Sequence, residues 1–177
     1  LGQLFDALAR NGAYPGRVGL VGLGIGTALT YQRPGGEAWN IYEIDPLVHR
    51  IALDARYFHF LTQCASAAGA HLVYGDARLS LANEPDGRFG LLILDAFSSD
   101  SIPVHLLTRE AMALYRRKLG PGGILMVHIS NRHLDLVPVL ASLARDGNMA
   151  ALVQRHRVKR DRARHRYPSV WVAPARE

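Results

Sequence analysis

The sequence is nearly devoid of cysteine, since Cys64 is the only one among its 177 residues. One cysteine excludes a disulfide within the chain and a metal site built from several cysteines, and it favours a reducing compartment. Long apolar runs are also absent, and none approaches the roughly 20 residues that a membrane-spanning helix needs. Residues 1–10 lack the apolar centre of a secretion signal. These absences predict a cytoplasmic location.

Acidic residues are fewer than basic ones, 15 against 21, which gives a formal net charge of +6. Seven of the basic residues lie within residues 155–166, against the single acid Asp161. Such a cluster can bind phosphates, but it lacks the interleaved aromatic residues that stack on bases. We interpret it as a solvated loop and expect no nucleic-acid partner; nucleic-acid modification is the less favoured alternative.

Hydrophobic residues make up 49% of the chain and charged residues 20%, which is typical of a folded globular protein. The length suits one hydrophobic core, and no internal repeat is visible. We therefore expect one domain over residues 1–177. Because the chain opens on Leu1 rather than Met, a piece of a longer protein is also considered.

Seven short apolar runs predict the fold. The first six alternate with segments of helical spacing, a pattern typical of a parallel sheet with helices on both faces. The last two have no helix between them and predict an antiparallel hairpin at one sheet edge. We expect a Rossmann-like α/β fold with a mostly parallel seven-stranded sheet. The expected strands are residues 18–21, 38–44, 71–74, 89–94, 123–129, 150–154 and 169–173.

The expected helices have recognisable ends. Thr108 can cap the start of one helix, and Gly120 with Pro121 stops it. A helix is also expected from about residue 27 to just before Pro34. The remaining expected helices are residues 1–10, 46–54, 56–68, 79–82 and 134–144.

Three glycines at every second position, Gly22, Gly24 and Gly26, end the first expected strand. Glycine allows positive φ and lets the backbone approach a ligand closely. The following helix N-terminus carries unpaired N–H groups and the positive end of the helix dipole. This strand, turn and helix predict a nucleotide site; the alternative is a tight turn without a ligand.

Acidic residues end the next three strands of the sheet. Glu43 lies about 20 residues after Gly22, where a carboxylate can accept both ribose hydroxyls of an adenosine. Asp76 follows the third strand, next to a predicted adenine edge, and Asp95 follows the fourth and faces the predicted reacting centre. Any one acid alone can be a solvated cap. Three acids at matching strand ends, beside a glycine turn, favour a ligand site.

Six segments carry a family resemblance: Val21-Gly22-Leu23-Gly24-Ile25-Gly26, Tyr42-Glu43-Ile44-Asp45-Pro46, Gly75-Asp76-Ala77-Arg78, Leu94-Asp95-Ala96-Phe97-Ser98-Ser99-Asp100, Leu107-Thr108-Arg109-Glu110 and Pro121-Gly122-Gly123. They resemble the class I S-adenosylmethionine-dependent methyltransferases. Within that superfamily the chain is most similar to the spermidine synthase-like proteins, including those fused behind a membrane-embedded half. The resemblance extends from about residue 17 to residue 171.

The resemblance implies how a nucleoside binds. The glycines would line its amino-acid end, Glu43 would hold the ribose, and Asp76 with Ala77 would contact the adenine. The implied ligand is S-adenosylmethionine or its decarboxylated form, with no metal. The full predicted cofactor-binding set is Gly22, Gly24, Gly26, Glu43, Asp45, Asp76, Ala77 and Asp95.

The resemblance also implies a catalytic group. In the aminopropyltransferases, two aspartates three residues apart follow the fourth strand, orient the substrate amine and accept its proton. Here Asp95 matches the first aspartate, Ser98 stands at the second position, and Asp100 lies five residues after Asp95. A carboxylate attracts an ammonium group and can take the proton that the amine must lose. We predict Asp95 and Asp100 as catalytic residues.

The predicted function is aminopropyl transfer to a small-molecule amine, as in polyamine biosynthesis. The alternatives are a methyltransferase with another acceptor and a non-catalytic nucleotide-sensing domain. The small N-terminal β domain of the synthases has no counterpart in this sequence. Implied partners are a second copy in a homodimer and, in a full-length protein, a membrane-embedded N-terminal half. The chain would then be the cytoplasmic domain of a membrane protein.

The histidines are scattered and show no spacing typical of metal ligands, so no metal site is predicted. His128 lies on the fifth expected strand. We interpret it as a core or rim histidine with satisfied hydrogen bonds; a catalytic base is the alternative.

Overall fold

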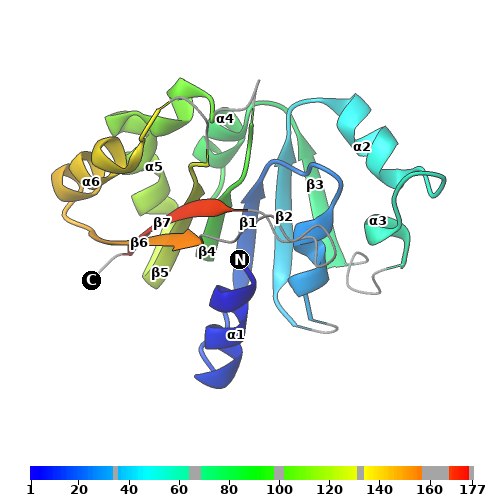
Figure 1. Ribbon diagram of the computed structural model, residues 1–177, viewed down its shortest axis with the longest axis horizontal. Helices are drawn as coiled ribbons and strands as arrows, with labels where there is room; N and C mark the ends of the chain where they lie inside the picture. The colour runs from blue at the N-terminus through cyan, green and yellow to red at the C-terminus, as the bar shows by residue number, and fades with distance from the viewer. Residues whose placement is uncertain (34–35, 64–68, 98–101, 131–133, 157–167, 176–177) are drawn as a thin grey trace.

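The computed structural model describes residues 1–33, 36–63, 69–97, 102–130, 134–156 and 168–175. Its strands form one seven-stranded sheet in the order β3-β2-β1-β4-β5-β7-β6 (Figure 1). The first five in this order are parallel, whereas β7 pairs antiparallel with both β5 and β6. The predicted α/β sheet with a C-terminal hairpin is therefore confirmed. The strands are β1 Arg17–Val21, β2 Ala38–Glu43, β3 Ala70–Tyr74, β4 Phe89–Leu94, β5 Leu119–His128, β6 Ala150–His156 and β7 Ser169–Ala175.

Helices cover both faces of the sheet, and each face has its own hydrophobic core. On one face α4, α5 and α6 pack against side chains such as Leu92, and on the other α1, η1 and α2 pack against side chains such as Ile93. Because β4 is buried on both faces, its sequence is a continuous apolar run. The helices are α1 Gly2–Arg10, η1 Thr27–Tyr31, α2 Pro46–Leu53, α3 Phe60–Gln63, α4 Ala77–Ala82, η3 Val104–Leu107, α5 Arg109–Lys118 and α6 Val137–Asp146.

Three elements differ from their predicted form. The helix expected from residue 27 is the short 3₁₀ segment η1, because Gly26 bends the chain before it and Gln32 is already extended after it. Of the helix expected over residues 56–68, the described part contains only α3 as an α-helix, and Cys64 lies outside the described residues. The fifth strand begins at Leu119, earlier than expected, because Leu119 already pairs with Phe89 of β4. The basic segment 157–167 lies outside the described residues.

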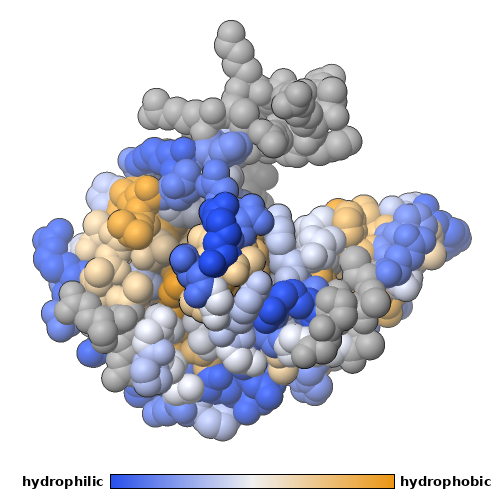
Figure 2. All heavy atoms as spheres, turned by 90° about the horizontal axis from the view of Figure 1, so that it is seen from below, coloured by the Kyte–Doolittle hydropathy of each residue, from blue (hydrophilic) through white to orange (hydrophobic). Residues whose placement is uncertain are grey.

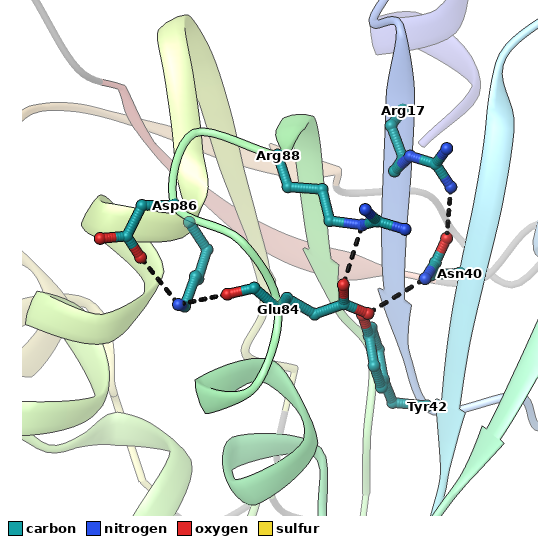
Figure 3. A network of polar contacts seen from close by, with 7 residues as sticks. Arg17, Asn40, Tyr42, Glu84, Asp86 and Arg88 are labelled. Atoms are coloured by element: carbon teal, nitrogen blue, oxygen red, sulfur yellow. Dashed lines mark hydrogen bonds and ion pairs between the residues drawn. The ribbon is translucent and has the colours of Figure 1, made fainter.

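A network of polar side chains joins β2 and the starts of β1 and β4 to the turn after α4 (Figure 3). The Glu84 carboxylate accepts hydrogen bonds from the Tyr42 hydroxyl at 2.7 Å and from Asn40 at 3.1 Å, and it pairs with Arg88 at 2.8 Å. Burial, together with the hydrogen bond to Glu84, raises the pKa of Tyr42 well above its usual value. The hydroxyl of Tyr42 therefore stays protonated at physiological pH and donates its hydrogen bond to Glu84. Lys118 joins the same turn by donating to the Glu84 backbone oxygen at 2.6 Å.

The side seen from below in Figure 2 has hydrophilic residues interleaved with separate hydrophobic patches. Within the described ranges, no helix is both long and apolar enough to cross a bilayer.

Candidate active site

A cavity of about 630 Å³ opens at the carboxyl ends of the central strands. Ligands of open α/β sheets bind at this edge. The segment after β4 and the 3₁₀ helix η3 contribute further lining residues, among them Phe97 and His105. The lining that the described residues form contains three carboxylates and neither lysine nor arginine. The cavity brings together six of the predicted residues: Gly22, Gly24, Glu43, Asp76, Ala77 and Asp95.

Gly22 lies where the end of β1 approaches the segment after β4. Its φ is +93°, and a Cβ atom on it would lie 2.5 Å from the backbone oxygen of Asp95. Its N–H also donates to the backbone oxygen of Tyr42 at 2.9 Å. Only glycine fits both the conformation and the space. Gly24 also has a positive φ, +53°, but a Cβ on it would meet nothing within 4 Å, so it leaves open space.

Glu43 holds two loops of the cavity with one buried carboxylate. Its Oε2 accepts a hydrogen bond from the N–H of Leu23 in the glycine turn, and its Oε1 accepts one from the N–H of Asp45, both at 2.9 Å. The residue is only 7% exposed. Each carboxylate oxygen has a second lone pair, so Glu43 retains the capacity to accept hydrogen bonds from a ligand.

Asp76 joins the two walls of the cavity. Its Oδ1 accepts a hydrogen bond from the N–H of Leu79 at 3.0 Å and so caps α4. Its Oδ2 lies 3.1 Å from Nε2 of His105, which comes from η3. A ligand amine that binds Asp76 would therefore meet a carboxylate that already has a histidine partner.

Asp95 pairs with a histidine from the neighbouring strand. Its Oδ1 lies 2.7 Å from Nδ1 of His128, at the end of β5. The other ring nitrogen, Nε2, lies 2.8 Å from Oγ of Ser130, and this oxygen accepts a hydrogen bond from the N–H of Val170 at 2.8 Å. Both nitrogens of His128 thus have partners, which fits the interpretation as a histidine with satisfied hydrogen bonds.

Two predicted residues that the structure describes do not line the cavity, and a third lies outside the described residues. Gly26 precedes η1 with a φ of +86°, and a Cβ on it would meet the side chain of Leu61 at 3.1 Å, so it serves packing there. The side chain of Asp45 is turned to α2, which it caps by accepting from the N–H of Leu47 at 2.8 Å. Asp100 lies outside the described residues. The binding roles of Gly26 and Asp45 and the catalytic role of Asp100 stay predictions.

Sequence reasoning assigned no site role to His105 and did not pair His128 with Asp95. The pairing of His128 with Asp95 follows from the strand register, because Leu94 of β4 pairs with Val127 of β5 and Asp95 and His128 are the next residues along each strand. Periodicity in the sequence does not give this register. For His105 we find no signal in the sequence, since the short 3₁₀ helix η3 that carries it has no apolar periodicity of its own. Within the described residues, no group of three or more acidic, histidine or cysteine side chains could hold a metal ion.

Comparison with known proteins gives one curated relative and many similar folds. The chain is 35% identical over 119 residues to the polyamine aminopropyltransferase of Vibrio vulnificus strain CMCP6, a match that covers 64% of this chain and 38% of that protein. No family model matches. The chain thus spans well under half the length of this curated relative.

Solved structures show the fold. Spermidine synthase from Thermotoga maritima matches 91% of this chain with a TM-score of 0.67 at 17% identity, over 54% of its own length. A methyltransferase dependent on S-adenosylmethionine from Archaeoglobus fulgidus matches 99% of this chain with a TM-score of 0.64 at 13% identity, over 94% of its own length. The chain is therefore similar in sequence over 119 residues to a polyamine aminopropyltransferase, and it shares its fold with spermidine synthase and S-adenosylmethionine-dependent methyltransferase structures.

Proposed function

We propose that this domain binds decarboxylated S-adenosylmethionine in the cavity and transfers its aminopropyl group to an amine. The observation that carries the proposal is the grouping of Glu43, Asp76 and Asp95 around one cavity beside the glycine turn. The identity with a polyamine aminopropyltransferase over 119 residues supports the same activity.

The chemistry of the lining supports a nucleoside without phosphates. Three carboxylates line the cavity and its described residues include no lysine or arginine, so a pyrophosphate would meet negative charge without a basic partner. A sulfonium ligand is a cation, and this lining suits it. We assign Glu43 to the ribose hydroxyls, Asp76 with Ala77 to the adenine, and Gly22 with Gly24 to the end that carries the sulfonium.

The reaction requires a neutral amine, because an ammonium group has no lone pair for attack. Asp95 attracts the ammonium form of the acceptor and takes one of its protons onto the carboxylate. The amine nitrogen then forms a bond to the methylene carbon next to the sulfonium. The bond from that carbon to sulfur breaks, and its electron pair stays on sulfur, which leaves as a neutral thioether.

Methyl transfer from intact S-adenosylmethionine is the second candidate. This chain matches 94% of the length of the Archaeoglobus fulgidus methyltransferase but about half of the Thermotoga maritima spermidine synthase. The extent of the match to the methyltransferase supports this second candidate. A homodimer, a membrane-embedded N-terminal half and a cytoplasmic location remain predictions that follow from the family resemblance.

Calorimetric titration with S-adenosylmethionine, its decarboxylated form and methylthioadenosine tests the proposal. We expect tightest binding of the decarboxylated form and, with a diamine added, an aminopropylated product by mass spectrometry. Asp95→Asn should leave nucleoside affinity within about tenfold but abolish turnover, because the amide cannot take the proton. Methylated product would support the second candidate, and binding without any product would support a sensing domain. No binding of any of the three nucleosides would refute the proposal.

A further inference from the structure

The aspartate at the end of β4 is the last member of a chain of hydrogen bonds that crosses three strands. It begins at the N–H of Val170 on β7, passes through Ser130 and His128 at the end of β5, and reaches Asp95 after β4. Every link is between 2.7 and 2.8 Å. A second aspartate three residues after Asp95 is missing, because Ser98 stands there.

The direction of this series of hydrogen bonds follows from its last acceptor. The ionised carboxylate of Asp95 only accepts hydrogen bonds, so Nδ1 of His128 carries a proton and donates it to Oδ1. In a neutral ring Nε2 is then an acceptor, and the hydroxyl of Ser130 donates to it while its oxygen accepts the N–H of Val170. All three links then point toward the carboxylate. Asp95 thereby selects the tautomer of His128, and Ser130 satisfies its other ring nitrogen.

Aromatic side chains fix the plane of the His128 ring. Trp171 of β7 stacks on it with ring centroids 4.3 Å apart and an interplanar angle of 5°, and Phe97 contacts it edge-on at 4.8 Å. The His128 side chain is 21% exposed, whereas the Asp95 side chain is 31% exposed and lines the cavity. The ring therefore has little freedom to turn away from the carboxylate.

We propose that His128 is a positioning residue for Asp95 and that Ser130 holds the ring in place through Nε2. His128 occupies Oδ1, and within the described part of the chain Oδ2 makes no such contact, so Oδ2 is available to the acceptor amine. This inference rests on the proposed function, in which Asp95 takes a proton from the amine. The residue that supports Asp95 is then His128 on the neighbouring strand β5, and not a second aspartate in the segment after β4.

Two substitutions at His128 separate hydrogen bonding from packing. His128→Asn places an amide N–H close to the position of Nδ1 but removes the ring that stacks on Trp171. His128→Phe keeps a stacked ring and removes the donor. We expect kcat to fall roughly 10- to 100-fold in His128→Phe, as for a misplaced catalytic group. In His128→Asn we expect kcat within about tenfold of wild type. In both variants we expect the KM for the nucleoside to stay within about threefold of wild type, because the proposed nucleoside contacts are made by other residues. A purely structural role for the ring predicts the opposite order of the two variants.

Nitrogen NMR of the imidazole provides a readout that does not depend on turnover. We expect the Nδ1–H tautomer of His128 in the wild-type protein and in Ser130→Ala, and a mixture of both tautomers in Asp95→Ala, which removes the acceptor. A wild-type Nε2–H tautomer, or an unchanged kcat in His128→Phe, would overturn the inference. If the expected tautomer is present, the nucleoside binds and no amine reacts, then the proposed function has failed while the geometry stands. The positioning role then falls with the reaction that it serves.

Discussion

Replacing Gly22 with alanine tests whether the glycine turn and Asp95 act as one unit. The added Cβ would lie 2.5 Å from the backbone oxygen and 2.9 Å from the carbonyl carbon of Asp95. Ordinary contact begins at 3.4 Å, so the end of β4 must move by about 0.9 Å. Both atoms that the Cβ meets belong to the backbone and cannot rotate away as a side chain would.

The expected cost has two parts. An alanine at positive φ loses roughly 1–2 kcal/mol, and overpacking of a close contact adds about 1–3 kcal/mol. Gly22→Ala should therefore reduce the free energy of unfolding by about 2–5 kcal/mol. A displacement of Asp95 near 1 Å should also lower kcat by about 100-fold.

Gly12→Ala is the matched control, because Gly12 has a φ of +64° and a Cβ on it would meet nothing within 4 Å. It should lose only the conformational part, roughly 1–2 kcal/mol, and keep full turnover. Urea denaturation measures the unfolding free energy, and the product assay with the preferred nucleoside measures kcat. Equal losses of stability in the two variants, or full turnover in Gly22→Ala, would refute the argument.

Three further substitutions probe single contacts. Glu43→Gln should reduce the free energy of unfolding by about 1–3 kcal/mol, because one amide oxygen replaces two acceptors for two buried N–H groups; urea denaturation measures it. Thr108→Ala removes the cap of α5, whose hydroxyl oxygen accepts from a backbone N–H at 3.2 Å, and should cost about 1 kcal/mol in the same assay with unchanged nucleoside affinity. The hydrogen bond from Lys118 holds the pKa of Asp86 below its usual 3.8, so its stabilising contribution is present above that pH and lost as the pH falls further. Asp86→Asn should therefore show a flatter dependence of unfolding free energy on pH in that acidic range.

For each of these three substitutions, one outcome would contradict the prediction. Thr108→Ser keeps the hydroxyl and should match wild type, so an equal loss in both Thr108 variants would contradict the capping argument. A Glu43→Gln protein as stable as wild type would show that the two loops do not depend on the carboxylate. Parallel pH curves for wild type and Asp86→Asn would show that Lys118 does not stabilise the ionised form.

The sheet could be predicted from the sequence because most of its strands have a strong local signal. The run at Phe89–Leu94 is apolar throughout since both faces of β4 are buried, and the hairpin follows from the missing helix before β7. The 3₁₀ form of η1 could not be predicted, because the spacing of residues 27–31 also suits an α-helix. The positive φ of Gly26 and the extended Gln32 that bound the segment are backbone conformations that spacing does not give. The early start of β5 could not be predicted either, because it depends on a pairing with Phe89, which is distant in the sequence.

The acids of the site were predictable because parallel strands end at one edge of a sheet. The histidines that pair with two of these acids were harder to predict. The pair of Asp95 with His128 requires the register of β4 on β5, which periodicity does not give. The pair of Asp76 with His105 depends on where the short 3₁₀ helix η3 packs, which the sequence does not give. Asp45 belongs to the same motif as Glu43, yet it caps α2 and does not line the cavity.

The two backbone hydrogen bonds that the Glu43 carboxylate accepts affect how related sequences should be compared. Two main-chain N–H groups need this carboxylate whether or not a nucleoside is bound. A descendant that has lost its chemistry would therefore be expected to retain the glutamate, because losing it loosens two loops. Asp95 is different, since its described side-chain contact is to His128 and to no backbone group. Among such descendants, substitution at Asp95 is the change that would mark lost turnover, and Glu43 would survive as a trace of the ancestral fold.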